Sequence, residues 1–480
     1  MAERRQNRLS QAGKTADTGT RPSQAGETAD TGTRLTQTGD PAETGTRPPQ
    51  AGKTADTGEQ RLIFHVDVNS AFLSWTAVRR LEEDPSAVDL RTVPSVIGGD
   101  QRTRHGIVTA KSIPAKRYGI ETAEPIAQAM RKCPGLIVVS GDFATYRRFS
   151  RALMELLGHY APVLEQASID EAYLDMTGTR EHFRALETKE RPYPLCAADA
   201  IRKEVRETLG FTVNVGISVN KLLAKMASDF AKPDRTHTLF PEEVENKMWP
   251  LPIGSLYGCG KKTAERLRSV GILTIGDAAA AEPSVLRSLL GEKWGEYILR
   301  SARGISDSPV SDVREEAKSY SNETTTAEDI TADNMEQLLP PLLRKLCARV
   351  SGRLGRDGVY AGTIGVMVKT SDFRNRSMQQ SLKDPVNREE EILPVAEALM
   401  RQLLLGANGR GGLLAEGGVR LVGVSCSNLQ TEEFRQLTFT DLAKERENDK
   451  RQQRTERLDR MTRALQARYG DGALHRGTGE

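Results

Sequence analysis

The chain has 480 residues, of which 38% are hydrophobic, and its 68 basic against 65 acidic side chains leave a formal net charge of +3. This length predicts roughly two to four domains. Five scattered cysteines with no CxxC pair argue against a disulfide framework or a zinc site and favour a reducing compartment. We find no apolar stretch long enough to span a membrane and no signal-peptide core, and therefore expect a soluble, cytoplasmic protein without a membrane partner.

Residues 1–60 form a polar, repetitive segment. The stretch SQAGKTADTGTRP at 10–22 recurs from residue 23 with a Lys-to-Glu change before its last residue, and looser copies begin at residues 36 and 49. Almost no large apolar side chain occurs here, so the segment cannot bury enough surface to offset its ordering entropy. We expect a disordered extension, either a flexible tether or a neutral expansion, since a repeat without a hydrophobic face does not indicate a solenoid.

Strands and helices alternate in the next block, up to about residue 240. The predicted strands cover residues 63–68, 167–174 and 211–218, and the predicted helices cover 146–160, 201–209 and 222–230. A sheet with helices on one side is typical of an α+β domain.

Two further blocks follow. The pattern of residues 251–310 predicts short helices around a Gly-Cys-Gly turn. Such a turn exposes backbone N–H groups at the start of a helix, where they can bind a phosphate. The alternative is a turn that only caps an ordinary helix. Predicted strands at 362–369 and 419–425 and helices at 335–354 and 389–405 make up the next block. Between Pro341 and Arg388 there are ten Lys or Arg against three Asp. This excess favours a nucleic-acid backbone as partner, with a solvated surface as the alternative.

Three carboxylates carry most of the functional information. Asp67 lies in the apolar run IFHVDV, and Asp170 and Glu171 are adjacent in ASIDEAYL. A buried carboxylate must be paired, neutralised or bound to a metal, and oxygen ligands suit Mg²⁺ beside substrate phosphates. The pattern predicts a metal-dependent phosphoryl-transfer site, although a lone strand Asp is more often structural and an Asp-Glu pair is usually a solvated turn. Adjacent strand residues face opposite ways, so Asp170 and Glu171 share a site only if a turn or twist lies there.

Four motifs in order, HVDVNSAF at 65–72, SIDEAYLD at 168–175, GISVNK at 216–221 and AKP at 231–233, resemble the Y-family of translesion DNA polymerases. The resemblance runs from about residue 62 to about residue 437. It implies an α+β multidomain fold, a right-hand polymerase with palm, small fingers, helical thumb and little-finger domain. The implied limits are 1–60 for the extension, 61–240 for the palm with the fingers inserted at about 77–140, 241–312 for a thumb with a helix-hairpin-helix, 313–435 for the little finger, and 436–480 for a clamp-binding peptide and charged tail.

The resemblance implies low-fidelity, poorly processive DNA synthesis across damaged template bases by two-magnesium nucleotidyl transfer. The implied ligands of two Mg²⁺ ions are Asp67, Asp170, Glu171 and the backbone carbonyl of Val68. Phe72 stands at the family's steric gate, where an aromatic ring excludes a ribose 2′-hydroxyl; a core phenylalanine is the alternative.

The implied triphosphate contacts depart from the family pattern. Lys232 matches the family lysine, but Lys116 stands in place of an arginine and supplies charge without the guanidinium fork. Ile113 replaces a tyrosine and Ala110 a threonine, which removes two polar contacts. Arg117 is a candidate substitute.

The first motif also departs from the family pattern, and the resemblance implies contacts to DNA. Asn69, Ser70 and Ala71 replace the commoner acidic and aromatic residues of the first motif, and none is an expected metal ligand. The implied DNA contacts are Gly258, Gly260 and Lys261 in the thumb and Arg374, Arg376 and Lys383 in the little finger.

The sequence QLTF resembles the clamp-binding peptide of bacterial polymerases, usually QLxLF. Gln436, Leu437 and Phe439 would dock on the ring-shaped sliding clamp, with Thr440 in place of the last aromatic. The expected partners of a monomeric enzyme are therefore primer-template DNA, deoxynucleoside triphosphates and the sliding clamp.

Two alternatives remain open at this point. A catalytically silent DNA- and clamp-binding scaffold related to these polymerases would be expected to lose one of the three carboxylates, and all are present. Gly98-Gly99-Asp100 resembles the signature of diguanylate cyclases, but Gln101 and Arg102 follow it, and the thumb-like hairpin argues against a cyclase.

Overall fold

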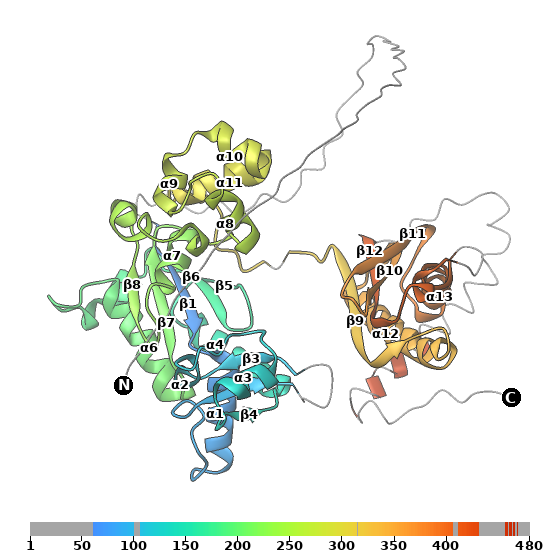
Figure 1. Cartoon of the computed structure of the whole chain (residues 1–480). Coiled ribbons are helices and arrows are strands. Elements are labelled where there is room, and N and C mark those ends of the chain that lie inside the picture. Colours follow the sequence, from blue (N-terminus) through green and yellow to red (C-terminus); the bar gives the residue numbers. More distant parts are fainter. Residues whose placement is uncertain are drawn as a thin grey trace, which may run out of the picture. The chain divides into compact units, whose positions relative to one another are not determined.

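The computed structural model describes residues 61–99, 106–313, 315–406 and 411–431, together with a few helical residues between 457 and 468 (Figure 1). The repetitive segment at 1–60, which we expect to be disordered, lies outside the described residues. No helix in the described ranges is long and apolar enough to cross a membrane.

The first part of the described chain is built on a five-stranded sheet with the strand order β5-β6-β1-β7-β8. Its strands are β1 (Ile63–Val68), β5 (Val163–Gln166), β6 (Glu171–Asp175), β7 (Val213–Ser218) and β8 (Thr236–Thr238). β1 is central and runs antiparallel to both β6 and β7. Because every residue of β1 is buried, the strand is apolar except at His65 and Asp67.

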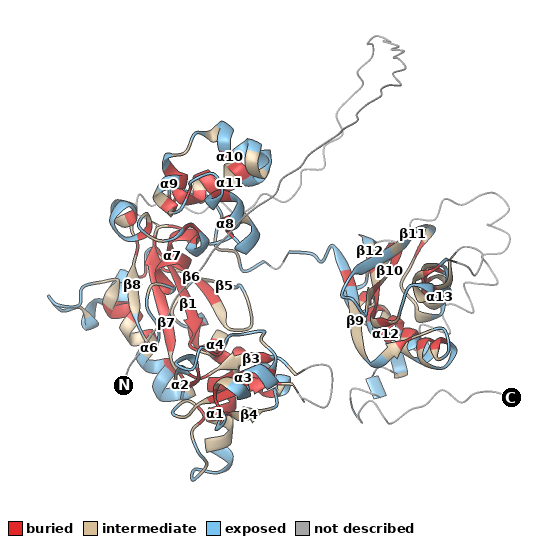
Figure 2. Cartoon of the chain, viewed as in Figure 1, coloured by how far each residue is buried: buried red, intermediate tan, exposed pale blue. Residues whose placement is uncertain are grey.

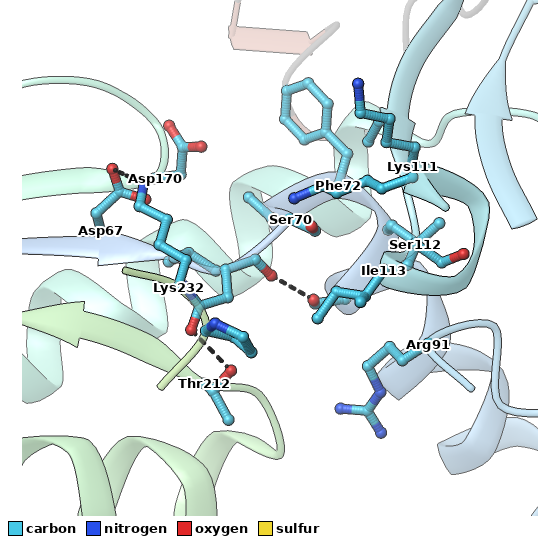
Figure 3. Close-up of a pocket in the computed structure, with 18 of the residues that line it drawn as sticks. Asp67, Ser70, Phe72, Arg91, Lys111, Ser112, Ile113, Asp170, Thr212 and Lys232 are labelled. Carbon is cyan, nitrogen blue, oxygen red and sulfur yellow. Dashed lines mark hydrogen bonds and ion pairs between the residues drawn. The ribbon is translucent and has the colours of Figure 1, made fainter. Parts of the chain in front are cut away.

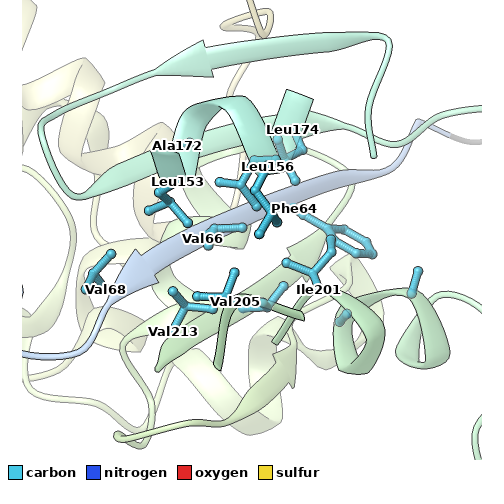
Figure 4. Packing of buried hydrophobic residues seen from close by; sticks show 14 of the residues in the cluster. Phe64, Val66, Val68, Leu153, Leu156, Ala172, Leu174, Ile201, Val205 and Val213 are labelled. Carbon is cyan, nitrogen blue, oxygen red and sulfur yellow. The ribbon is translucent and has the colours of Figure 1, made fainter. Parts of the chain in front are cut away.

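Helices cover both faces of this sheet. Phe64, Val66 and Val68 pack against α4 (Phe143–Gly158) and α6 (Leu195–Leu209), as Figure 4 shows. Successive side chains of a strand alternate, so Asp67 projects from the other face, where α7 (Lys221–Ser228) lies. The helices predicted from apolar spacing over 146–160, 201–209 and 222–230 are thus confirmed, as is the first strand.

A small sheet with the order β3-β2-β4 lies between β1 and α4 in the sequence. Its strands are β2 (Ser95–Gly98), β3 (Val108–Lys111) and β4 (Ile137–Val139), accompanied by α2 (Ile113–Lys116) and α3 (Ile126–Lys132). These elements share a separate apolar cluster that includes Val96, Val108 and Ile126. The helix α1 (Ala71–Glu83) connects β1 to this unit. Short helices α5 (Arg180–Phe183) and η1 (Arg184–Leu186) follow β6.

Short helices dominate residues 241–302. They are η2 (Pro241–Glu243), η3 (Val244–Met248), η4 (Ile253–Ser255), α8 (Lys261–Arg268), α9 (Ile275–Ala280), α10 (Pro283–Leu290) and α11 (Glu292–Ala302). Their apolar cluster continues into Leu222, Leu223 and Met226 of α7, so this helical unit packs directly on the first part of the chain.

The C-terminal part has its own four-stranded sheet, with the order β11-β10-β12-β9. The elements are β9 (Ser319–Ile330), α12 (Met335–Asp357), β10 (Tyr360–Thr370), β11 (Asn375–Val386), α13 (Glu389–Leu405), η5 (Leu413–Ala415) and β12 (Val419–Gln430). Alternate strand residues such as Ile364, Val366 and Val424 pack with both helices into one core. Figure 2 marks buried stretches on β10, α12 and α13. The strands and helices predicted in this block are confirmed.

One sequence prediction is wrong. Residues 167–174 do not form a buried strand throughout, because β6 begins only at Glu171 and the chain turns between Gln166 and Glu171. Asp170 lies in that turn and is half-buried. The turn provides the bend that adjacent carboxylates need to serve one site.

Candidate active site

Asp67 and Glu171 lie side by side on the face of the sheet that α7 covers. They are directly opposite each other in the β1–β6 ladder, and opposite residues of an antiparallel pair project from the same face. Asp67 is 7% exposed and Glu171 is half-buried. Two carboxylates so close to each other favour a cation between them.

Lys225 of α7 supplies a positive charge at this point. Its Nζ lies 3.0 Å from Asp67 Oδ2 and 2.5 Å from Glu171 Oε1, and the residue is 8% exposed. Burial disfavours the ammonium, but Asp67 and Glu171 outweigh it and raise the pKa of Lys225. Burial also acts to raise the pKa of Asp67, but Lys225 and Lys232 outweigh it and lower that pKa. For Glu171, burial and the neighbouring Asp67 raise the pKa.

Asp170 stands slightly apart from this ion-paired group. Its carboxylate accepts a hydrogen bond from Ser168 Oγ at 2.6 Å, while the N–H of Val68 donates to its backbone carbonyl at 3.1 Å. Among the residues that the structure describes, no three acidic, His or Cys side chains gather closely enough to form a metal-ligand group as they stand. Asp67 and Asp170 nevertheless line one pocket, and their all-oxygen donor set fits a hard divalent cation.

That pocket has a volume of about 620 Å³ and opens between the five-stranded sheet, α1 and the small sheet. Figure 3 shows Asp67, Asp170 and Lys232 together on one side, and Phe72, Lys111 and Ile113 on the other. The pocket therefore has an acidic end and a wall that carries cations and an aromatic ring.

Three lysines line this pocket. Lys232 Nζ lies 3.0 Å from Asp67 Oδ2 and 2.8 Å from Asp229 Oδ1. Burial opposes its charge, but the two carboxylates outweigh it and raise the pKa of Lys232. The pKa of Lys116 is lowered, first by burial and then by the charges of Lys111 and Lys232. Lysines that lie close enough to lower the pKa of a neighbour repel one another. This repulsion favours binding of a polyanion in the pocket.

Phe72 of α1 lines the same pocket and is fixed by aromatic neighbours. Its ring stacks on Tyr146 with a centroid distance of 4.5 Å and an interplanar angle of 14°, and it lies 6.1 Å from Phe143 and 6.2 Å from Trp75. The ring is thus both a packing residue and part of the pocket wall.

Several pocket and site residues were not predicted from the sequence. Lys225 could have been suspected, because it lies three residues after Leu222 on the buried side of an amphipathic helix, where a lysine needs an acidic partner. Lys111 gave no such indication. Arg117, the suggested substitute, is exposed and does not line the pocket.

The proposed DNA contacts lie apart from this pocket. Gly258 and Gly260 are exposed before Lys261, where α8 begins, and Gly258 has a φ of 84°. A Cβ at Gly258 would lie 2.5 Å from Tyr297 Oη, so the turn requires glycine on two grounds.

The three basic residues proposed as DNA contacts in the C-terminal part are all exposed. Arg376 and Lys383 belong to the edge strand β11, and Arg374 precedes it and pairs with Asp372 at 2.8 Å. Gln436, Leu437 and Phe439 lie outside the described residues.

Comparison with known proteins identifies the family. The model of the impB/mucB/samB family matches residues 66–229, the IMS family HHH motif matches 241–272, and the impB/mucB/samB family C-terminal domain matches 317–439. The chain is 40% identical over 416 residues to DNA polymerase IV of Clostridium acetobutylicum, covering 87% of this chain and 97% of that protein. It is 36% identical over 422 residues to DNA polymerase IV 1 of Bacillus subtilis, covering 87% and 93%.

A solved structure gives the same result. The Y-family DNA polymerase chimera Dbh-Dpo4(243-245)-Dbh matches with a TM-score of 0.63 and 26% identity, over 77% of this chain and 100% of that chain. The right-hand polymerase fold predicted from the motifs is thereby confirmed, and the comparisons favour an enzyme over a silent scaffold. The chain matches these relatives over nearly their full length and carries the three carboxylates on its sheet and in the turn before β6, and it belongs to the Y-family of translesion DNA polymerases and is of the bacterial DNA polymerase IV type.

Proposed function

We propose that this chain extends a primer across damaged template bases by transferring deoxynucleotides at the pocket described above. The observation that carries the proposal is the pocket itself, with carboxylates at one end and lysines and Phe72 along its wall. A deoxynucleoside triphosphate has matching chemistry, since its phosphates need cations and its sugar and base offer apolar surface.

Y-family polymerases depend on divalent metal ions. In this chain Asp67, Asp170, Glu171 and the carbonyl of Val68 would hold two Mg²⁺ ions, which would activate the primer 3′-hydroxyl and neutralise the departing pyrophosphate. The hydrogen bond from Val68 N–H to the carbonyl of Asp170 supports this grouping because it keeps β1 and the turn together. Asp170 lines the pocket, so its carboxylate would reach a metal ion bound there.

The side chains around the substrate would have two tasks, neutralising the triphosphate and selecting the sugar. Lys232 and Lys116 would neutralise the triphosphate, and the convergence of their charges on one pocket supports this role. Phe72 would lie beneath the sugar and exclude a ribose 2′-hydroxyl. Its stacking on Tyr146 supports the role, because a gate must not move aside.

DNA would be held outside the pocket by two surfaces. The exposed N–H groups at the start of α8, next to Gly258, Gly260 and Lys261, suit a backbone phosphate, as helix starts do. Arg374, Arg376 and Lys383 would add phosphate contacts from the C-terminal sheet.

We assign the domains to the limits that the motifs imply. The palm covers 61–240 with the fingers at about 77–140, the thumb 241–312 and the little finger 313–435. A sliding clamp would bind the peptide at 436–439 of a monomeric polymerase and compensate for its low processivity.

Primer extension on a template with an abasic site tests the proposal. We expect Mg²⁺-dependent incorporation opposite the lesion that stops on addition of EDTA and is absent in Asp67→Asn. DNA binding without any incorporation on undamaged or damaged template, with Mg²⁺ present, would instead establish a scaffold.

A further inference from the structure

Two buried asparagines lie directly behind the loop that carries Lys232. Asn214 of β7 is directly opposite Asp67 in the β1–β7 ladder, and Asn69 follows Asp67 by two residues. Asn69 is 8% exposed and Asn214 is fully buried. Asn69 Nδ2 donates to Asn214 Oδ1 at 3.1 Å, which joins the two amides into one unit.

This amide pair holds the backbone on both sides of Lys232. Before the lysine, Asn214 Nδ2 donates to the carbonyl of Ala231 at 2.7 Å. After it, the N–H of Asp234 donates to Asn69 Oδ1 at 2.9 Å, and the N–H of Arg235 donates to Asn214 Oδ1 at 3.2 Å. Three hydrogen bonds therefore fix three residues that flank the lysine, Ala231, Asp234 and Arg235, although this segment contains no helix or strand before β8.

Further contacts keep the amides and the loop in place. Thr212 Oγ1 donates to Asn69 Oδ1 at 2.9 Å, and Asn214 Nδ2 also donates to the carbonyl of Ser228 at 2.9 Å. On the other side of the loop, Arg202 Nε and Arg206 Nη1 donate to the carboxylate of Asp234 at 3.0 and 2.6 Å. Thr212 and Lys232 lie on the same side of the pocket in Figure 3.

An amide side chain is suited to this task. Each asparagine both donates and accepts, and it adds no charge beside Asp67. An aspartate at position 69 would keep the acceptor for Asp234 but lose the donor to Asn214, and an aliphatic residue would lose both.

We propose that Asn69 and Asn214 are positioning residues that hold Lys232 at the place where it meets the triphosphate of the incoming nucleotide. The inference rests on the proposed function, because it takes Lys232 as a triphosphate contact. The network bonds the backbone on both sides of the lysine, and its members Asn69 and Thr212 also line the pocket. It therefore affects nucleotide binding far more than primer-template binding.

The test is single-nucleotide insertion kinetics with a double-mutant cycle. Asn69→Leu should raise the KM for the deoxynucleotide about tenfold, the size expected for loss of buried hydrogen bonds, with a smaller change in kcat. Asn69→Asp should lose less than Asn69→Leu, and Thr212→Val, which removes one bond to Asn69, should shift KM in the same direction by about threefold. In a Lys232→Ala background, Asn69→Leu should have little further effect on KM, because both changes act through one side chain.

Val205→Ala is the control for a general loss of stability. Val205 is fully buried on α6, across the sheet from the asparagines, so this variant should lower the melting temperature without changing KM. If Asn69→Leu does not fold, Asn69→Asp and Thr212→Val carry the same comparison.

Two outcomes would overturn the inference, and they are distinguishable. If Lys232→Ala raises KM but the Asn69 effect persists undiminished in that background, the network does not act through Lys232. If Lys232→Ala leaves KM unchanged, the triphosphate role of Lys232 fails and the inference fails with it.

Discussion

Lys225 Nζ lies 3.0 Å from the carboxylate of Asp67, and both side chains are buried on the face of the sheet that α7 covers. The same ammonium reaches Glu171. This lysine balances charges that would otherwise repel each other. It thus holds the carboxylates close together, although its ammonium would repel a divalent ion bound between them.

The three carboxylates should be individually essential. Asp67→Ala, Asp170→Ala and Glu171→Ala should each reduce the rate of primer extension by about a thousandfold or more, since a metal ligand acts in the transition state. DNA affinity should remain largely intact because it depends on other surfaces. Quench-flow extension beside an anisotropy titration measures both, and near-wild-type extension by any variant would refute the site.

Lys225→Met should destabilise the protein in the absence of divalent ions by about 3 kcal/mol, because it removes the largely buried ammonium that Asp67 and Glu171 share. Mg²⁺ or Ca²⁺ should restore more stability to this variant than to the wild type, since the ion no longer meets a competing charge. Urea unfolding with and without the ion measures this difference. Lys221→Met is the matched control: it lies on the same helix but pairs with Glu165 at 2.6 Å, and its loss of stability should not depend on the ion.

Phe72→Ala should increase incorporation of ribonucleotides relative to deoxyribonucleotides by about tenfold or more. The aromatic ring would exclude a ribose 2′-hydroxyl by steric overlap, and such an overlap costs well over about 1.4 kcal/mol, which corresponds to a factor of ten. Some stability should be lost with the stacking on Tyr146. Phe143→Ala serves as control: its ring is 5.5 Å from Tyr146 but does not line the pocket. Equal sugar preference in both variants would assign Phe72 to the core alone.

DNA affinity should fall steeply with salt, and replacing Arg374, Arg376 and Lys383 by alanine should reduce the log–log slope by about one for each phosphate that the protein no longer neutralises. Arg401→Ala is the control, because Arg401 is paired with Glu336 on the helical side of the same unit at 2.6 Å. A triple variant with an unchanged slope would show that these residues form a solvated surface.

Replacing Gln436, Leu437 and Phe439 by alanine should leave extension by the polymerase alone unchanged and remove its stimulation by the sliding clamp. The reason is that the peptide follows the DNA-binding parts and carries no group useful for the chemistry. Extension assays with and without clamp, next to a melting curve, measure this. A variant that loses thermal stability and basal activity together would place Leu437 and Phe439 in the core instead.

The sequence predicted those elements whose cause is local. The apolar run of β1 and the helical spacing in α4, α6 and α13 follow from side-chain periodicity, which is why these elements lie close to where they were expected. The right-hand architecture came from ordered motifs and their family resemblance. The same apolar composition led to a wrong prediction at 167–174, because the turn before Glu171 is set by pairing of β5 with β6.

The sequence by itself determined the family, through ordered motifs that include three carboxylates, the lysine of AKP and an aromatic residue. Only the tertiary structure decided how they are held. Lys225 meets Asp67 across 158 residues, and Asn69 meets Asn214 across 145. Such contacts depend on which strands become neighbours and which helix covers them, and no local pattern records that choice. Long-range packing therefore decided that Lys225 neutralises Asp67 and that Asn69 bonds Asn214, and the motif sequences do not indicate either contact.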